Sequence, residues 1–198
     1  MRRYFLSVAL LLAGFISSAQ TDTALASLQK RLGEYMFLNQ QKDFERLFDY
    51  IHPSIYQIAS REQMVEAFKN AYNSEQMSIS IDTIRKNKIG ENFEFNNSSY
   101  RRVDYYMVLS LKFNDQSMMD DSSFVETMIS NLKQGFPTKS VSFDKAKKQF
   151  VVSGDDKLIA IKDKPSSVWM FLSYEKKNPY GSKLFPNEVI AHFKLDDN

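Results

Sequence analysis

The sequence contains no cysteine, and only two of its 198 residues, His52 and His192, are histidines. Disulfide bonds and thiolate ligands are therefore excluded, and a zinc site of the usual kind would lack most of its ligands. The two histidines do not form the H-E-x-x-H spacing of a metalloprotease. We therefore expect no metal site and no cofactor, and we expect both histidines to be surface or structural residues.

Glycine is also scarce, and the six glycines are too scattered to form a phosphate-binding loop. Neither the G-x-G-x-x-G fingerprint nor a P-loop is present. The G-x-S-x-G motif that exposes a nucleophilic serine is absent as well. The sequence thus carries no signature of nucleotide binding or of nucleophilic catalysis.

Long hydrophobic runs are limited to one, at the N-terminus. Arg2 and Arg3 precede an apolar run over residues 4–16, and Ser17-Ser18-Ala19 follows with small side chains. This order is typical of a secretory signal peptide, and the run is shorter than the roughly 20 residues of a membrane span. We expect a signal peptide over residues 1–19 and a single exported domain over residues 20–198, in the periplasm or secreted.

The charge of the expected mature domain is balanced. The full chain has 26 basic and 24 acidic residues, and loss of Arg2 and Arg3 leaves 24 of each. Nucleic-acid-binding domains usually carry a basic excess. We therefore expect no nucleic-acid partner, and no membrane attachment once the signal peptide is removed.

Apolar residues recur at three- and four-residue steps after the signal peptide, which predicts three helices. A proline ends the second at His52-Pro53, and Ser60 with Gln63 forms a capping box at the start of the third. The three apolar stripes are Leu25, Leu28, Leu32, Tyr35 and Met36; then Phe44, Leu47, Phe48 and Ile51; then Met64, Phe68, Ala71 and Tyr72.

The apolar period changes to two from about residue 79, which predicts antiparallel strands. In the clearest strand, 103–113, the odd-numbered residues from Val103 to Phe113 share one face, and the even-numbered face, which includes Ser110, is expected to be solvated. Turn chemistry at Gly154-Asp155-Asp156 separates two further strands. The other strands are expected at 140–143, 149–152, 157–162 and 167–174.

Two more helices are expected among and after the strands. A capping box formed by Ser123 and Glu126 predicts an inserted helix that stops at Gly135. Pro186 is typical of a first helical position, and it predicts a C-terminal helix with Val189, Ile190 and Phe193 facing inward.

Helices followed by an antiparallel sheet predict an α+β fold. The segment 42–48, Lys-Asp-Phe-Glu-Arg-Leu-Phe, which runs on to His52-Pro53, resembles the D-x-x-x-L…P second helix of the nuclear-transport-factor-2-like superfamily. That superfamily includes SnoaL-like and ketosteroid-isomerase-like proteins. Residues 60–73 resemble its third helix, and Trp169-Met170-Phe171 resembles its W-x-I/F strand. The resemblance implies a cone-shaped fold, with N-terminal helices packed on a curved sheet. The inserted and C-terminal helices depart from it.

Enzymes of that superfamily place a carboxylate or histidine inside the cone, where a general base must point at the substrate. Asp82 and Asp104 fall on the polar side of their strands, opposite to Tyr105 and Met107. We therefore expect no catalytic residue. A one-residue error in register would reverse this expectation.

The candidate ligand-binding residues are instead aromatic or apolar, although plain core packing is the alternative role. We expect a non-catalytic exported domain that binds a small apolar ligand or a protein partner, or forms a homodimer through the sheet face. The alternative function is a small acid–base enzyme of the ketosteroid-isomerase or dehydratase kind. The candidate pocket residues are Tyr35, Tyr56, Tyr72, Tyr105, Met107, Trp169 and Phe171.

Overall fold

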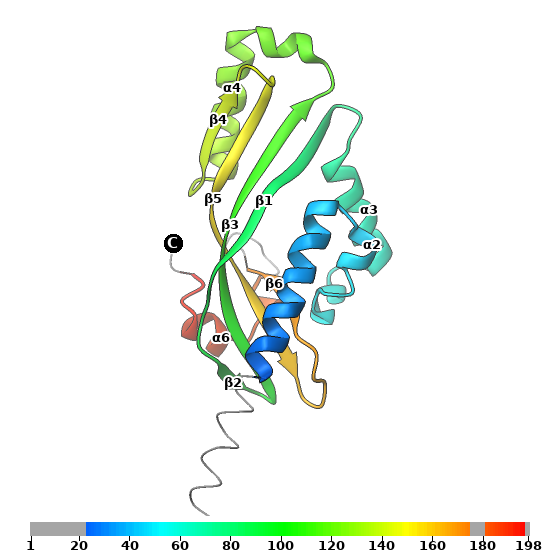
Figure 1. The fold of residues 1–198 in the computed structure, drawn as a ribbon, viewed down its shortest axis with the longest axis vertical. Coiled ribbons are helices and arrows are strands. Elements are labelled where there is room, and N and C mark those ends of the chain that lie inside the picture. The colour runs from blue at the N-terminus through cyan, green and yellow to red at the C-terminus, as the bar shows by residue number, and fades with distance from the viewer. Residues whose placement is uncertain (1–22, 175–180, 197–198) are drawn as a thin grey trace, which may run out of the picture. The chain divides into compact units, whose positions relative to one another are not determined.

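The structure, a computed structural model, describes residues 23–174 and 181–196 (Figure 1). The chain divides into two compact units, Met1–Glu34 and Tyr35–Asn198. Residues 23–34 of the first unit are all helical, and Leu28 and Leu32 are buried. The predicted signal peptide lies outside the described residues. None of the helices within the described ranges is long and apolar enough to cross a membrane.

The second unit begins with helical residues 35–41, followed by α2 (Phe44–Leu47), the 3-10 helix η1 (Pro53–Gln57) and α3 (Arg61–Tyr72). The capping box of α3 is confirmed, because Ser60 and Gln63 satisfy each other's backbone amides. The predicted extension of α2 to Ile51 is wrong. Ile51 pairs instead with Phe171, through backbone bonds of 2.8 and 3.1 Å on either side. This long-range pairing overrides the local helical pattern.

A six-stranded antiparallel sheet follows these helices in the second unit, so the predicted α+β class with a curved sheet is confirmed. Figure 1 shows the three long strands side by side, with short strands at both ends. The strand order is β1 (Met77–Ile89), β3 (Ser98–Phe113), β5 (Gln149–Asp163) and β4 (Ser140–Asp144), while β2 (Phe93–Phe95) pairs with β3 and β6 (Met170–Ser173) pairs with β5.

β5 is a single continuous strand, so the predicted turn at Gly154-Asp155-Asp156 is wrong. It pairs with β3 from Phe150 to Asp163, and this long register overrides the local turn signal. On its other edge β5 pairs with β4 through Ser153 and with β6 from Leu158 onward. Residues 154–157 therefore leave a gap between β4 and β6 on that edge.

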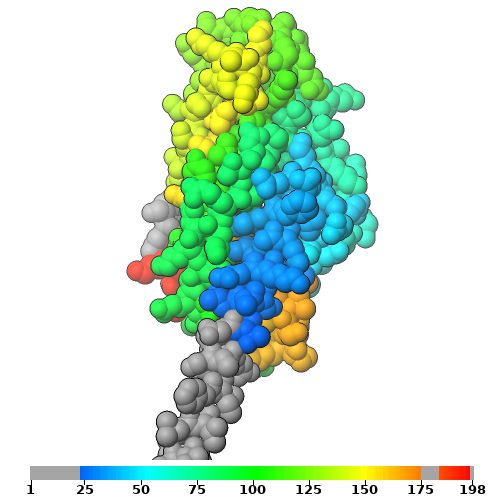
Figure 2. Space-filling model, viewed as in Figure 1, coloured from blue at the N-terminus to red at the C-terminus, as the bar shows by residue number. Residues whose placement is uncertain are grey.

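Two separate hydrophobic cores flank this gap. At one end, α4 (Ser122–Gly135) and the 3-10 helix η2 (Gln116–Asp120) pack on the sheet, and Figure 2 shows this segment, coloured green to yellow, gathered at one end of the unit. At the other end lie α5 (Gly181–Leu184) and α6 (Asn187–His192). We call these the α4 core and the α6 core. The α4 core contains Leu109, Leu111, Leu132, Phe150 and Val152, and the α6 core contains Tyr100, Ile159, Ile161, Val189 and Phe193.

The boundaries of α4 and α6 differ slightly from prediction. Asp121, not Ser123, is the N-cap of α4, since its carboxylate accepts the Ser123 amide at 2.8 Å. Pro186 is the N-cap of α6 rather than its first residue. The predicted inward face of α6 is confirmed by the burial of Val189, Ile190 and Phe193.

The predicted solvated face of β3 is corrected at Ser110, which is only 4% exposed. Its hydroxyl donates to the Asp82 carboxylate and accepts from Gln149 Nε2 at 3.1 Å. The even-numbered face of β3 is thus enclosed by polar neighbours here and by α6 further along. Parity alone separates the two faces of a strand but does not show which face is open.

Candidate functional site

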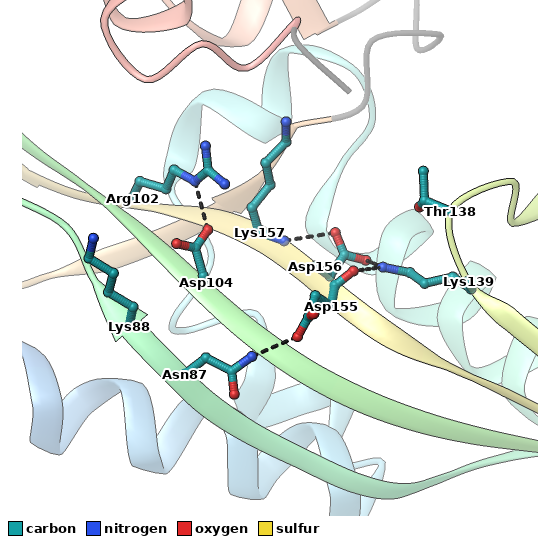
Figure 3. Close-up of a pocket in the computed structure, with 9 residues that line it drawn as sticks. All are labelled: Asn87, Lys88, Arg102, Asp104, Thr138, Lys139, Asp155, Asp156 and Lys157. Carbon is teal, nitrogen blue, oxygen red and sulfur yellow. Dashed lines mark hydrogen bonds and ion pairs between the residues drawn. The ribbon is translucent and has the colours of Figure 1, made fainter.

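A polar cavity of about 490 Å³ lies over the gap in the edge of β5. We call it the polar cleft. Three adjacent strands and the segment before β4 supply its side chains (Figure 3). They are Asn87, Lys88, Arg102, Asp104, Thr138, Lys139, Asp155, Asp156 and Lys157.

The register of the sheet brings opposite charges into one row. Asp104 on β3 is paired with Lys88 on β1 and with Lys157 on β5. Side chains of directly paired residues lie on the same face of a sheet. Figure 3 shows Lys88, Arg102 and Lys157 projecting to the same side, toward the C-terminal segment. The row therefore presents alternating positive and negative charge to the cleft.

Each carboxylate of the cleft is held by a neighbouring donor. Arg102 Nε donates to Asp104 Oδ1 at 2.7 Å, and Asn87 Nδ2 donates to Asp155 Oδ1 at 2.7 Å. Lys139 Nζ lies 3.0 Å from Asp156 Oδ2. Within the described part of the chain, Asp104 and Asp155 each keep a second carboxylate oxygen with no hydrogen-bond donor. Charge-assisted bonds of this kind fix the side chains while leaving acceptors for a ligand.

Gly154 makes room for Lys139 at the gap. A Cβ at residue 154 would lie 3.0 Å from Lys139 Cδ, and the backbone there has φ of 155°. The Lys139 side chain is only 7% exposed, and its ammonium also contacts the backbone carbonyl of Asp155. The segment that the sequence predicted as a turn is therefore the floor of the cleft.

The C-terminal end of α6 closes one side of the cleft. Arg102 Nη1 donates to the Phe193 carbonyl at 3.2 Å, and Lys157 Nζ donates to the Leu195 carbonyl at 2.9 Å. Cations stabilise the C-terminal carbonyls of helices in this way. A second cavity of about 380 Å³, which we call the α6 cavity, shares Lys88, Arg102 and Asp104 with the cleft. It is also lined by Gly90, Glu91, His192, Phe193 and Lys194.

A third cavity, of about 560 Å³, lies along α4 and has an apolar floor with a charged rim. We call it the α4 groove. Lys148 and Asp120 form an ion pair of 2.6 Å at its rim. The apolar lining residues are Met119, Val125, Ile129 and Phe143.

The seven predicted pocket residues line none of these three cavities. Trp169 and Phe171 are fully buried, and the Tyr35 ring centroid lies 4.8 Å from that of Phe171. Tyr105 is buried, and Met107 packs against the α4 core. Their role in ligand binding stays a prediction.

The two remaining tyrosines of that set lie among the helices. The Tyr72 ring centroid is 5.1 Å from that of Phe44. The Tyr56 hydroxyl donates to the Phe48 carbonyl at 3.1 Å. Both residues pack against the cluster formed by α2, α3 and residue 38.

A serine–histidine–aspartate network lies outside the cleft. His52 Nε2 is 2.9 Å from Asp163 Oδ2, and His52 Nδ1 is 2.9 Å from Ser54 Oγ. The Ser54 amide also donates to Nδ1 at 3.3 Å, so the imidazole is the N-cap of η1. Because Nδ1 already accepts this backbone amide, the geometry favours a structural role for His52 over activation of Ser54.

Sequence reasoning missed the polar cleft because its charges are spread over four segments and each resembles an ordinary solvated strand end. The paired Lys88, Asp104 and Lys157 could be found only from the register. The part of the chain that the structure describes contains no group of three histidine, aspartate or glutamate side chains that could hold a metal ion.

Comparison with known proteins finds no family model that matches the chain and no curated protein with a similar sequence.

Proposed function

We propose that the protein is a non-catalytic binding protein and that the polar cleft holds a small ligand with charges of both signs. One observation carries the proposal: four cations and three carboxylates converge on a single cavity of about 490 Å³. Cavities of roughly 300–1,000 Å³ with a few fixed polar groups are typical of small-molecule sites. A zwitterion, such as an amino acid or a short peptide, matches the alternating charges of Lys88, Asp104 and Lys157.

The contacts within the cleft favour recognition over catalysis. The carboxylates of Asp104, Asp155 and Asp156 each already interact with a cation or an amide donor. Their neighbours fix the free oxygens of Asp104 and Asp155 as hydrogen-bond acceptors for a ligand, which recognition needs, whereas a general base must also be aimed at a substrate proton. The acid–base enzyme is kept as the alternative, and turnover of a bound ligand would favour it.

Binding can be tested by thermal shift and calorimetry with a panel of amino acids and dipeptides at low ionic strength. We expect at least one to bind, and Asp104→Asn to weaken it about tenfold or more, because a hydrogen bond to a charged group contributes about 1.5–3 kcal/mol. Glu75→Gln, which removes an exposed carboxylate outside the cleft, is the matched control. Binding that is equally strong in both variants, or no binding at all, would contradict the proposal.

The α4 groove supports a second candidate function, the binding of a small apolar ligand. Its floor is formed by Val125, Ile129 and two further apolar side chains. An apolar fluorescent dye, 8-anilinonaphthalene-1-sulfonate, should bind with enhanced emission that Val125→Gln reduces. Ser130→Gln on the exposed face of α4 should leave the emission unchanged. Equal emission from both variants would argue against the groove.

We also propose that the chain is an exported member of the nuclear-transport-factor-2-like superfamily. The order of helices before a curved antiparallel sheet supports the fold assignment, and the basic and apolar N-terminal pattern supports export. Mass spectrometry of the exported protein should find Gln20 at its N-terminus. Recovery of the intact chain from Met1 in a membrane fraction would contradict export as a cleaved protein.

A further inference from the structure

We propose that the α6 cavity binds an oxyanion, a carboxylate or phosphate group, and that it receives the anionic end of a small free ligand. The inference rests on the proposed function of the polar cleft, with which this cavity shares Lys88, Arg102 and Asp104. The inference also predicts how the ligand is oriented. Its anionic end should lie in the α6 cavity, because that cavity has more free hydrogen-bond donors than the polar cleft.

Three hydrogen-bond acceptors of the α6 cavity are already occupied. The Phe193 carbonyl accepts from Arg102 Nη1 at 3.2 Å, and the Gly90 carbonyl accepts from Arg101 Nη1 at 2.9 Å. Asp104 Oδ1 accepts from Arg102 Nε. The side-chain acceptors that remain for a cation are Asp104 Oδ2 and the Glu91 carboxylate.

Its donors, in contrast, are largely free. Among the described residues, the ammonium groups of Lys88 and Lys194 and the ring nitrogens of His192 have no hydrogen-bond or ion-pair partner. The same holds for Arg102 Nη2, since the other guanidinium nitrogens make the bonds given above. Glu91 is the one unpartnered carboxylate of the described lining. The three cations Lys88, Arg102 and Lys194 outnumber the two carboxylates, Glu91 and Asp104, so the charge of the lining favours an anion.

An aromatic contact fixes the His192 ring, and the backbone fixes the position of residue 194. The His192 ring is stacked on Phe93, with centroids 3.9 Å apart and planes at 12°. Lys194 has φ of 49°, and the Leu195 amide donates to the Ile190 carbonyl at 3.0 Å, which closes the end of α6. Glycine is the usual residue at such a left-handed helix end. A lysine at this position gains nothing for the backbone, but it places a cation at the cavity.

The proposal can be tested with inorganic phosphate and acetate as probes, by following backbone amide shifts in the full-length protein at low ionic strength. Both anions should produce saturable shifts at Gly90, His192 and Lys194. Lys88→Met and Lys194→Met should each weaken binding about threefold and the double variant about tenfold, while Glu91→Gln should tighten it about threefold, as expected for single charges in water. Lys88, Lys194 and Glu91 are exposed, so these changes should not affect folding.

Lys86→Met is the matched control, because Lys86 is an exposed lysine on the same strand that lines neither cavity. Shifts that do not saturate, or that Lys86→Met weakens as much as Lys88→Met does, would overturn the proposal. If the anions fail while an amino acid still binds in an Asp104-dependent manner, only this inference is lost. If neither binds, the proposed function fails too.

Phosphatidylglycerol vesicles form a third arm, which distinguishes a free ligand from a lipid headgroup. We expect no co-sedimentation of the protein with these vesicles. Co-sedimentation that the Lys88→Met/Lys194→Met double variant abolishes would assign the anion to a lipid and overturn the proposal of a small free ligand.

Discussion

Asp163 Oδ2 lies 2.9 Å from His52 Nε2, a contact between residues 111 positions apart in the chain. The other carboxylate oxygen of Asp163 accepts the Ser98 hydroxyl at 2.6 Å. Burial by itself would raise the pKa of Asp163, but the bonds from Ser98 and His52 outweigh it and hold the pKa below its ordinary value of 3.8. The contact therefore joins η1 to the end of β5 most strongly when Asp163 is ionised.

Acid stability should depend on Asp163. Because the pKa of Asp163 is lower in the folded state, its contribution to the free energy of unfolding is present above about pH 4 and is lost as the pH falls through the folded pKa. Asp163→Asn should be less stable than the parent protein at neutral pH, and the difference should narrow in acid. Urea unfolding at a series of pH values measures this. If the stability difference between Asp163→Asn and the parent protein were the same at every pH, the proposed role of the Asp163 carboxylate would be contradicted. Glu75→Gln, which removes an exposed carboxylate, serves as the control.

Alkaline stability should depend on Tyr35. Burial raises the pKa of Tyr35 to about 12, so the folded state resists ionisation of a hydroxyl that ionises near pH 10 in the unfolded chain. The free energy of unfolding should therefore fall as the pH rises from about 10 to 12, and Tyr35→Phe should reduce that fall. Tyrosinate absorbance and unfolding at alkaline pH report the two effects. Tyr174 provides a comparison with Tyr35. Its pKa is also raised to about 12, but the main cause is a hydrogen bond to the Asp196 carboxylate rather than burial.

Leu109 and Ser110 should both matter for stability, for different reasons. Leu109 belongs to the α4 core, and Leu109→Ala should cost about 2–5 kcal/mol through lost burial and a cavity. Ser110→Ala removes a buried hydroxyl that bonds Asp82 and Gln149, and it should cost about 1–3 kcal/mol. Chemical denaturation measures both. A negligible cost at Ser110 would show that its face is solvated after all.

Gly154 should not tolerate a side chain. Gly154→Ala would place a Cβ 3.0 Å from Lys139 Cδ in a backbone conformation that other residues rarely adopt. We expect a loss of about 1–3 kcal/mol in the free energy of unfolding. Gly135→Ala is the matched control, because a Cβ there meets no atom within 4 Å. Equal melting temperatures for the two variants would contradict this account of the gap.

The features predicted correctly are those that a short segment determines by itself. The capping box of Ser60 and Gln63, the end of α4 at Gly135 and the inward face of Val189 and Ile190 all follow from neighbours in sequence. They needed no knowledge of the rest of the chain.

The features that were missed depend on distant partners. Ile51 was predicted to be helical, but it pairs with Phe171. Gly154 was predicted to lie in a turn, but it lies within β5, which pairs with β3 along this stretch. The two-residue period predicted that Asp104 and Tyr105 lie on opposite faces of β3, and the sheet agrees with this. The face that carries Asp104 was expected to be solvated, but α6 encloses part of it. A cleft built from four segments cannot be predicted from any one of them, because each contributes only one to three of its seven charges.

The gap in the edge of β5 has a consequence for cooperativity. β4 and β6 pair with separate stretches of β5, and the buried residues of the α4 core and the α6 core form two separate clusters. Separate clusters of this kind can open independently, so one end of the sheet can open while the other stays closed. Native-state hydrogen exchange should then resolve two sets of amides with different opening free energies, separated near residues 154–157. Whatever occupies the polar cleft would bind across that boundary and couple the two ends.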